Sequence, residues 1–276
     1  MIGTSFAQRG LMLVEQPGAW GRQGLADSDL DHDVAAALQH RADVADLRLL
    51  AIRRPDRTAP VRRSWAVRPP GSSTTYWGEH ADDTDLLDLP LDDAIASVGE
   101  PAEGPTYLVC THSKRDACCA VFARPLAAAL DRLRPGQVWG CSHTGGHRFA
   151  PVVVAVPAGS PGAAMYGRVD VGALTRVVEA TEAGRVLPEL LRGPTGHPAH
   201  VQAALAHAYA GHPVPGDWRV LDVRETGPDG WRITLAGPSS YDLEVVAETR
   251  AEPMASCGKP EPSDQTHYRV LSSAPR

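Results

Sequence analysis

The sequence predicts an α/β protein in which one order of elements occurs twice and is followed by an antiparallel sheet. Short apolar runs alternate with helix-like stretches through residues 1–184. Residues 218–250 instead alternate apolar and polar side chains around Gly- and Pro-containing turns, as antiparallel strands do. The hydrophobic content of 43% over 276 residues supplies a core for one large domain or for two or three smaller ones.

Residues 1–100 are predicted to form a first α/β unit with the order strand, helix, strand, strand, strand, helix. Its helix begins near Asp31, where the carboxylate of Asp29 or Asp31 can accept from the free N–H groups of the first turn. A PPGSS turn separates the last two strands and predicts a hairpin. The expected elements are a strand at 11–15, a helix from near Asp31 through Val44, strands at 47–54, 63–69 and 74–80, and a short helix at 91–100.

Residues 104–184 are predicted to repeat that order as a second unit, after a Pro/Gly/Glu connector at 99–105. This order is the thioredoxin-like one without its middle helix, and the prediction rests on pattern rather than on matching residues. The expected elements are strands at 106–110, 137–142, 151–157 and 163–169, a helix at 115–133 that Pro125 bends or restarts, and a helix at 170–184 with Asp170 as its cap and Gly184 as its end.

Residues 185–276 are predicted to form C-terminal helices and a β meander. Residues 188–193 and 198–211 have helical patterns. Cys257 lies in the loop before the candidate last strand. The expected strands are 218–225, 231–237, 240–250 and 267–272.

Composition excludes several classes of protein. The net charge of −6 argues against a nucleic-acid surface, which needs a basic stripe. No apolar run approaches the roughly 20 residues that span a bilayer, and the first residues lack a signal-peptide pattern, so we expect a cytoplasmic protein that needs no membrane. The five clustered cysteines argue against a disulfide framework.

Metal-ligating side chains gather in residues 106–147, which hold four of the five cysteines and three of the eleven histidines. Cys110 ends a predicted strand and Cys119 lies near the start of a predicted helix. Strand ends and helix N-termini converge on one sheet edge, where the helix dipole stabilises thiolates. His143 and His147 are separated by three residues, two of them Gly, so both imidazoles can reach one metal.

The residues alone leave the metal open. A structural zinc with two Cys and two His ligands fits, although the short CxxC step of a zinc finger is missing. Cys118 and Cys119 point about 100° apart on a helix, so only one of them faces the metal. His112 and Cys141 are spare candidates, and a buried Cys is often only a small hydrophobic residue. Lys114 and Arg148 are near enough in sequence to offset negative charge.

The stretches CTHSKRDACC and HTGGHRFAPVVVAVPAG resemble the sucrase/ferredoxin-like family, which is similar to the thioredoxin-like 2Fe–2S ferredoxins. The resemblance covers most of residues 10–192. The family pattern, Cys-x8-Cys followed by His-x3-His, falls on Cys110, Cys119, His143 and His147. It implies a 2Fe–2S cluster rather than zinc. It also implies a cis proline at Pro151, whereas nothing in the sequence singles out the carboxylate pair of a sucrase.

The function expected from this resemblance is one-electron transfer or redox sensing, by a carrier rather than an enzyme. Two neutral imidazoles in place of thiolates raise the potential, as in Rieske centres, and can couple electron transfer to a proton. A potential that falls as pH rises is therefore expected. The partner is expected to be a redox protein that the sequence does not identify, and a mildly acidic carrier fits a basic one. The alternatives are a zinc-stabilised binding module with the same four ligands and a thiol-based redox enzyme that uses Cys118 or Cys119.

Overall fold

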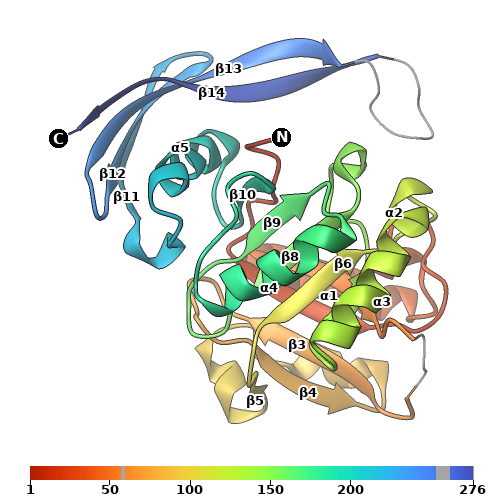
Figure 1. The fold of residues 1–276 in the computed structure, drawn as a ribbon. Coiled ribbons are helices and arrows are strands. Elements are labelled where there is room, and N and C mark those ends of the chain that lie inside the picture. The colour runs from red at the N-terminus through yellow and green to blue at the C-terminus, as the bar shows by residue number, and fades with distance from the viewer. Residues whose placement is uncertain (57–59, 253–261, 276) are drawn as a thin grey trace.

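The computed structural model describes residues 1–56, 60–252 and 262–275, with the side chains of 273–275 left out. The described strands form a ten-stranded mixed sheet and a separate four-stranded antiparallel sheet, with helices packed on both. The α/β prediction is therefore confirmed (Figure 1).

The first half of the large sheet is built around β1 (Gly10–Glu15). β1 pairs in parallel with β2 (Leu47–Arg53) and antiparallel with β3 (Arg63–Arg68). The hairpin partner of β3 is β4 (Tyr76–His80), and β5 (Glu100–Pro101) forms the edge. The predicted hairpin is thus present.

The second half repeats these pairings around β6 (Thr106–Cys110). β6 pairs in parallel with β7 (Val138–Cys141) and antiparallel with β8 (Val152–Val156), and β9 (Ala164–Gly167) pairs antiparallel with β8. The order β2-β1-β3-β4 therefore matches β7-β6-β8-β9 in both sequence and sense. The division into units at 1–100, 104–184 and 185–276 stays a prediction.

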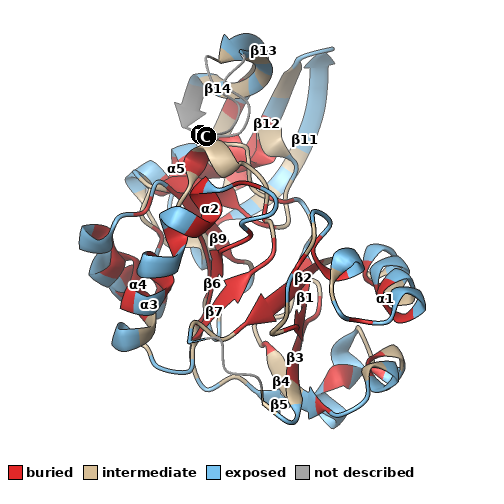
Figure 2. Cartoon of the chain, turned by 90° about the vertical axis from the view of Figure 1, so that its right-hand side faces the viewer, coloured by how far each residue is buried: buried red, intermediate tan, exposed pale blue. Residues whose placement is uncertain are grey.

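The two half-sheets are joined by the antiparallel pairing of β2 and β7, which has two residue pairs, and they pack on each other through a shared apolar layer. Side chains alternate across each strand, so Leu11 and Leu13 point toward strands of the second half, whereas Met12 and Val14 point toward α1 (His32–Val44). Figure 2 shows the result as four layers, with α1 outside one half-sheet and α3 and α4 outside the other. The site described below lies at one end of the middle, sheet-to-sheet layer.

Helix boundaries follow the predicted caps. The Asp31 carboxylate accepts from the backbone N–H groups of Asp33 and Val34, as expected for an N-cap. Asp170 accepts from Ala173 N at 2.8 Å and opens a 3₁₀ turn, η5 (Val171–Ala173), that leads into α4 (Leu174–Glu182). Gly184 follows in the left-handed region with φ 64°.

The helix predicted at 115–133 is split. α2 (Cys118–Val121) starts later than expected, because the Asp116 carboxylate accepts from Cys118 N at 2.9 Å. α3 (Ala123–Leu133) restarts at the turn that holds Pro125, whose ring has no N–H and disfavours an unbroken helix before it. The restart was predicted, and the Ala150–Pro151 peptide bond is cis as expected.

Two helix predictions are wrong. Residues 91–100 hold no α-helix: they form a 3₁₀ turn, η3 (Asp93–Ser97), which the Asp92 carboxylate caps, and then enter β5 at Glu100. Residues 188–193 are not helical, and Leu191–Pro194 instead form β10 against β9. Gly and Pro are poor helix residues, and the free edge of β9 offers the backbone a pairing partner. The remaining short turns are η1 (Leu25–Asp27), η2 (Asp83–Asp88), η4 (His147–Phe149) and η6 (Pro215–Asp217).

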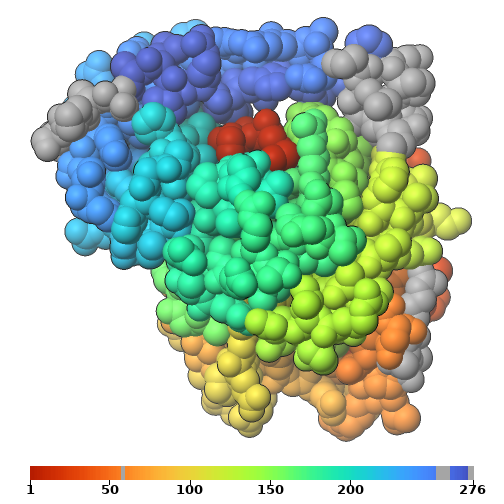
Figure 3. All heavy atoms as spheres, in the orientation of Figure 1, coloured from red at the N-terminus to blue at the C-terminus, as the bar shows by residue number. Residues whose placement is uncertain are grey.

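The C-terminal part contains one helix and the predicted meander, which packs on that helix. The sheet curves over α5 in Figure 1, and the N-terminal residues lie beneath it in Figure 3. Cys257 lies outside the described residues. The elements are α5 (Ala199–Gly211), β11 (Arg219–Gly227), β12 (Gly230–Ala236), β13 (Tyr241–Glu252) and β14 (Ser263–Pro275), the last longer than expected.

Nowhere in the described part of the chain does a helix combine the length and apolarity needed to cross a bilayer.

Candidate metal centre

Three predicted ligands meet at the carboxyl ends of β6 and β7. Cys110 is the last residue of β6 and pairs in register with Cys141, the last residue of β7, so His143 follows directly beyond the sheet edge. Cys119 reaches the same point from α2. One donor atom each of Cys110, Cys119 and His143 lie within 4.8 Å of one another. Both cysteines are buried and the histidine is half-buried, so this group could hold a metal ion.

The fourth predicted ligand extends this group rather than closing it. Cys110 Sγ lies 3.8 Å from His143 Nδ1, and the other nitrogen of His143, Nε2, lies 3.5 Å from His147 Nδ1. The two imidazole centres are 5.3 Å apart. The donors therefore form a compact group of Cys110, Cys119 and His143, with His147 beside the far nitrogen of His143.

The two thiols are not equivalent. A hydrogen bond from Cys119 is the largest influence on Cys110, and with His143 and the Thr144 N–H it holds the pKa of the Cys110 thiol well below its usual range despite burial. The same contact and burial raise the pKa of Cys119. These opposite directions favour a thiolate at Cys110 that accepts a hydrogen bond from the Cys119 thiol, and a thiolate is the form that binds metals.

His112 is a support and not a ligand. Its Nδ1 accepts from the backbone N–H of His143 at 3.1 Å, and its Nε2 donates to the Gly21 carbonyl at 2.5 Å. The ring is 2% exposed and meets Trp20 edge-on, with centroids 5.9 Å apart. Burial lowers the pKa of His112, in keeping with a neutral ring that donates at one nitrogen and accepts at the other.

Two arginines from distant strands hold the same loop. Arg48 of β2 donates from Nη2 to the His143 carbonyl at 3.0 Å, and Arg192 of β10 donates from Nη1 to the Gly145 carbonyl at 3.0 Å. Arg192 is fully buried, and burial lowers its pKa to about 10, so it is a cation at neutral pH. Both charges attract the Cys110 thiolate. Sequence reasoning missed both residues, because neither lies near the ligands along the chain.

The loop itself needs its glycines. Gly145 and Gly146 have φ of 88° and 63°, in the region that side chains avoid. A Cβ on Gly146 would lie 2.3 Å from Arg192 Nη2, whereas nothing lies within 4 Å of a Cβ on Gly145. The second glycine therefore also makes room for the arginine.

The other cysteine candidates take different roles. Cys118 is disulfide-bonded, so its sulfur is not available as a ligand, and Cys119 faces the metal group instead. Cys141 is a buried free thiol whose pKa burial raises. It lies outside the three-residue metal group and packs in the middle layer.

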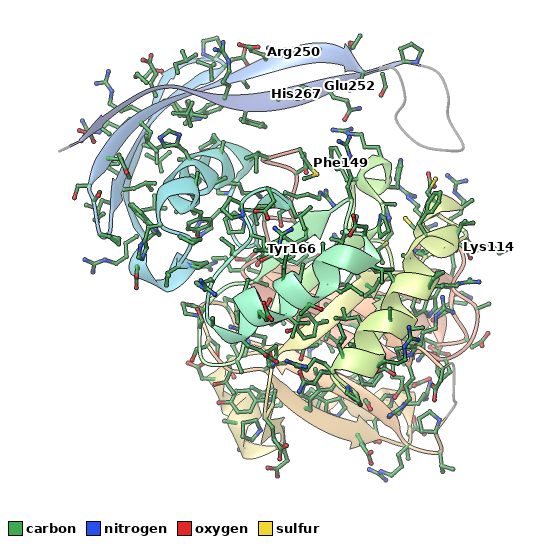
Figure 4. All side chains as sticks on the ribbon, viewed as in Figure 1. Lys114, Phe149, Tyr166, Arg250, Glu252 and His267 are labelled. Atoms are coloured by element: carbon green, nitrogen blue, oxygen red, sulfur yellow. The ribbon has the colours of Figure 1, made fainter. Side chains whose placement is uncertain are left out.

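The two basic residues expected near the site, Lys114 and Arg148, lie in different surroundings. Lys114 is exposed at the molecule's edge in Figure 4. Arg148 Nη1 instead donates to Gln265 Oε1 of β14 and stacks on Phe149 at 4.5 Å. Figure 4 places Phe149 below the β13–β14 ribbon, which therefore contacts the residues that follow His147.

Of three comparisons with known proteins, the one with family models finds a match. A search of the curated proteins finds no match. A search of the solved structures finds none either. The family model described as sucrase/ferredoxin-like matches residues 3–193, which span the whole ten-stranded sheet apart from its last residue and include all four predicted ligands. The chain therefore belongs to the sucrase/ferredoxin-like family.

Proposed function

We propose that this protein carries or senses single electrons with a 2Fe–2S cluster bound by Cys110, Cys119, His143 and His147. The position of His147 is the observation that carries the proposal. Four ligands of one tetrahedral zinc would lie about 4 Å from one another. Cys110, Cys119 and His143 meet that spacing, whereas His147 lies outside their group and adjoins the far nitrogen of His143. A centre with two metals can take a ligand beyond the compact group, as a 2Fe–2S cluster does.

The donor types also suit the cluster. Bound there, a 2Fe–2S centre supplies one-electron chemistry at a potential raised by its neutral imidazoles. The two cysteines are buried against the sheet, which keeps water from the thiolates. Arg48 and Arg192 offset negative charge there. The two histidines are half-exposed, so theirs is the side from which electrons, and protons on the imidazoles, exchange with a redox partner.

The fold supports the same assignment. Each half of the large sheet has four strands in one order, with helices on its outer face. We infer that both halves are thioredoxin-like units and that the second is the ferredoxin-like one, because it supplies every proposed ligand.

Zinc is the second candidate, and one observation favours it. The compact group holds three donors, Cys110, Cys119 and His143, which is the number of protein ligands in zinc sites with an open fourth position. A thiol-based enzyme has less support, because Cys119 is buried and its pKa is raised, both of which disfavour the reactive thiolate.

Anaerobic purification followed by visible spectroscopy and iron, sulfide and zinc analysis tests the proposal. We expect a red-brown protein with iron and sulfide in equal amounts. Cys110→Ala should lose the colour, whereas Cys141→Ala, the register partner on β7, should keep it. A colourless protein with stoichiometric zinc would establish the second candidate instead.

Replacement of His147 by Cys tests the histidine ligation. A thiolate brings negative charge to the cluster, so His147→Cys should lower the midpoint potential while a cluster is kept. A redox titration followed by visible absorption measures the shift. An unchanged or raised potential would contradict ligation by His147.

A further inference from the structure

A cavity of about 640 Å³ opens beside His143, on the side of the first half-sheet. It is lined by residues of α1, by residues 47–49 of β2, and by residues 22–26, which lead into and begin η1. We call it the α1 groove, and its polar and charged lining residues are Gln8, Arg22, Gln23, His32, Gln39, His40, Asp43, Arg48, His112, Arg115, Ser142 and His143.

The α1 groove is basic in a chain of net charge −6. Arg22, Arg48 and Arg115 line it, together with four imidazoles. Asp43 is the only carboxylate among the described lining residues, and its Oδ1 already accepts from Gln39 Nε2 at 2.8 Å. The local charge is therefore opposite in sign to that of the whole chain.

None of these arginines forms an ion pair with any carboxylate that the structure describes. Arg48 is the clearest case, because its Nη2 binds the His143 carbonyl while its Nε is buried without an acceptor. Burial lowers the pKa of Arg48, and Cys141, Asp43 and Cys110 offset this only in part. The guanidinium of Arg48 is therefore a half-buried cation that no described carboxylate neutralises, beside a cavity that an anion can enter.

We propose that the α1 groove binds a small organic anion with at least two carboxylate or phosphate groups. Planar guanidinium forks recognise both groups, and three of them converge on one cavity. The cavity volume lies within the range of about 300–1,000 Å³ that small-molecule sites have. A small ligand therefore fits the observations better than a protein segment does. Binding of the anion does not depend on the proposed cluster, although the groove ends at one of its ligands.

Isothermal titration calorimetry of the full chain with two probes, pyrophosphate and citrate, tests this site and separates phosphate from carboxylate recognition. The double variant Arg22→Gln/Arg115→Gln changes two exposed residues and should weaken binding of the preferred probe at least tenfold. Arg132→Gln/Arg219→Gln removes the same charge from exposed positions outside the groove and should bind like the wild type. Arg48→Lys keeps the charge but loses the fork, and should weaken binding severalfold.

Three outcomes would overturn the proposal. They are an affinity of the groove variant equal to that of its control, no binding of either probe up to millimolar concentration, and groove-dependent binding of an oligoglutamate peptide alone. The titrations are repeated after metal removal by a chelator and desalting. If anion binding persists in a colourless protein, the anion site is supported even where the redox proposal fails. If a coloured protein binds neither probe, the redox proposal is supported and the anion site is contradicted.

Discussion

His112 connects the two halves of the molecule through one neutral ring. Its two nitrogens bind Gly21 of the first half and the amide of His143 in the second. The two hydrogen bonds fix the tautomer of the His112 ring, and the ring in turn holds the loop of His143. Removal of the ring would leave two buried polar groups without a partner, which destabilises the fold.

We expect His112→Ala to lower the free energy of unfolding by about 1–3 kcal/mol, because the Gly21 carbonyl and the His143 amide lose their buried partner. It should also speed loss of the bound metal to a chelator. Denaturant unfolding and the rate of colour loss measure the two effects. His200→Ala, which removes a ring stacked on Trp231 in the C-terminal sheet, is the control. Equal metal loss in both variants would rule out a positioning role for His112.

At this scale the sequence predicts ligands better than their supports. Cys110 and Cys119 could be placed because a strand end and a helix start converge in any such unit. Arg48 and Arg192 could not, since each reaches the loop through a strand pairing that joins residues far apart along the chain. Local sequence carries no signal for those contacts.

The loop from β7 to β8 is held by residues from three other parts of the chain. Its backbone carbonyls and amide bind three side chains, and its glycines adopt conformations with positive φ. These contacts hold the loop without help from a metal.

Two alanine substitutions distinguish the cost of a positive φ angle from the cost of steric crowding. Gly145→Ala should cost about 1 kcal/mol of stability, because only the positive φ is disfavoured. Gly146→Ala should cost more and reduce metal retention, because its Cβ would also displace Arg192. Thermal unfolding and iron content measure the difference. Equal losses of stability and iron in both variants would show that Arg192 can move away from the new methyl group without cost.

Elements with strong local signals were predicted well, as α1 with its Asp31 cap and the β3–β4 hairpin show. β10 was not, because it forms only where β9 leaves an edge, and that edge is a property of the assembled sheet. The helix that contains Cys119 was predicted, but its late start depends on the Asp116 side chain.

The whole molecule should lose stability in acid. Burial lowers the pKa of His80, with Arg63 adding to the effect and Asp83 opposing it, and burial alone lowers that of His197. As pH falls through about 6.5, the unfolded chain binds protons that the folded chain does not, so the unfolded state is favoured. The stabilisation is full above that pH and is lost as pH falls toward the folded-state values.

We therefore expect the Tm of the protein to fall between pH 7.5 and 5.5, and His80→Gln/His197→Gln to show a shallower fall. Differential scanning fluorimetry at several pH values measures both slopes. His32→Gln/His40→Gln, which changes two exposed histidines, should leave the slope unchanged. A wild-type Tm that does not depend on pH would contradict the prediction.

The boundary between the two halves has a consequence for how long a metal would stay bound. The proposed ligands all belong to the second half, yet Arg48 of the first half binds their loop directly and Gly21 binds it through His112. Separation of the halves would remove these contacts and expose Cys110 and Cys119, which pack in the middle layer. We therefore expect a bound metal to be released more slowly as the contact between the halves becomes more stable.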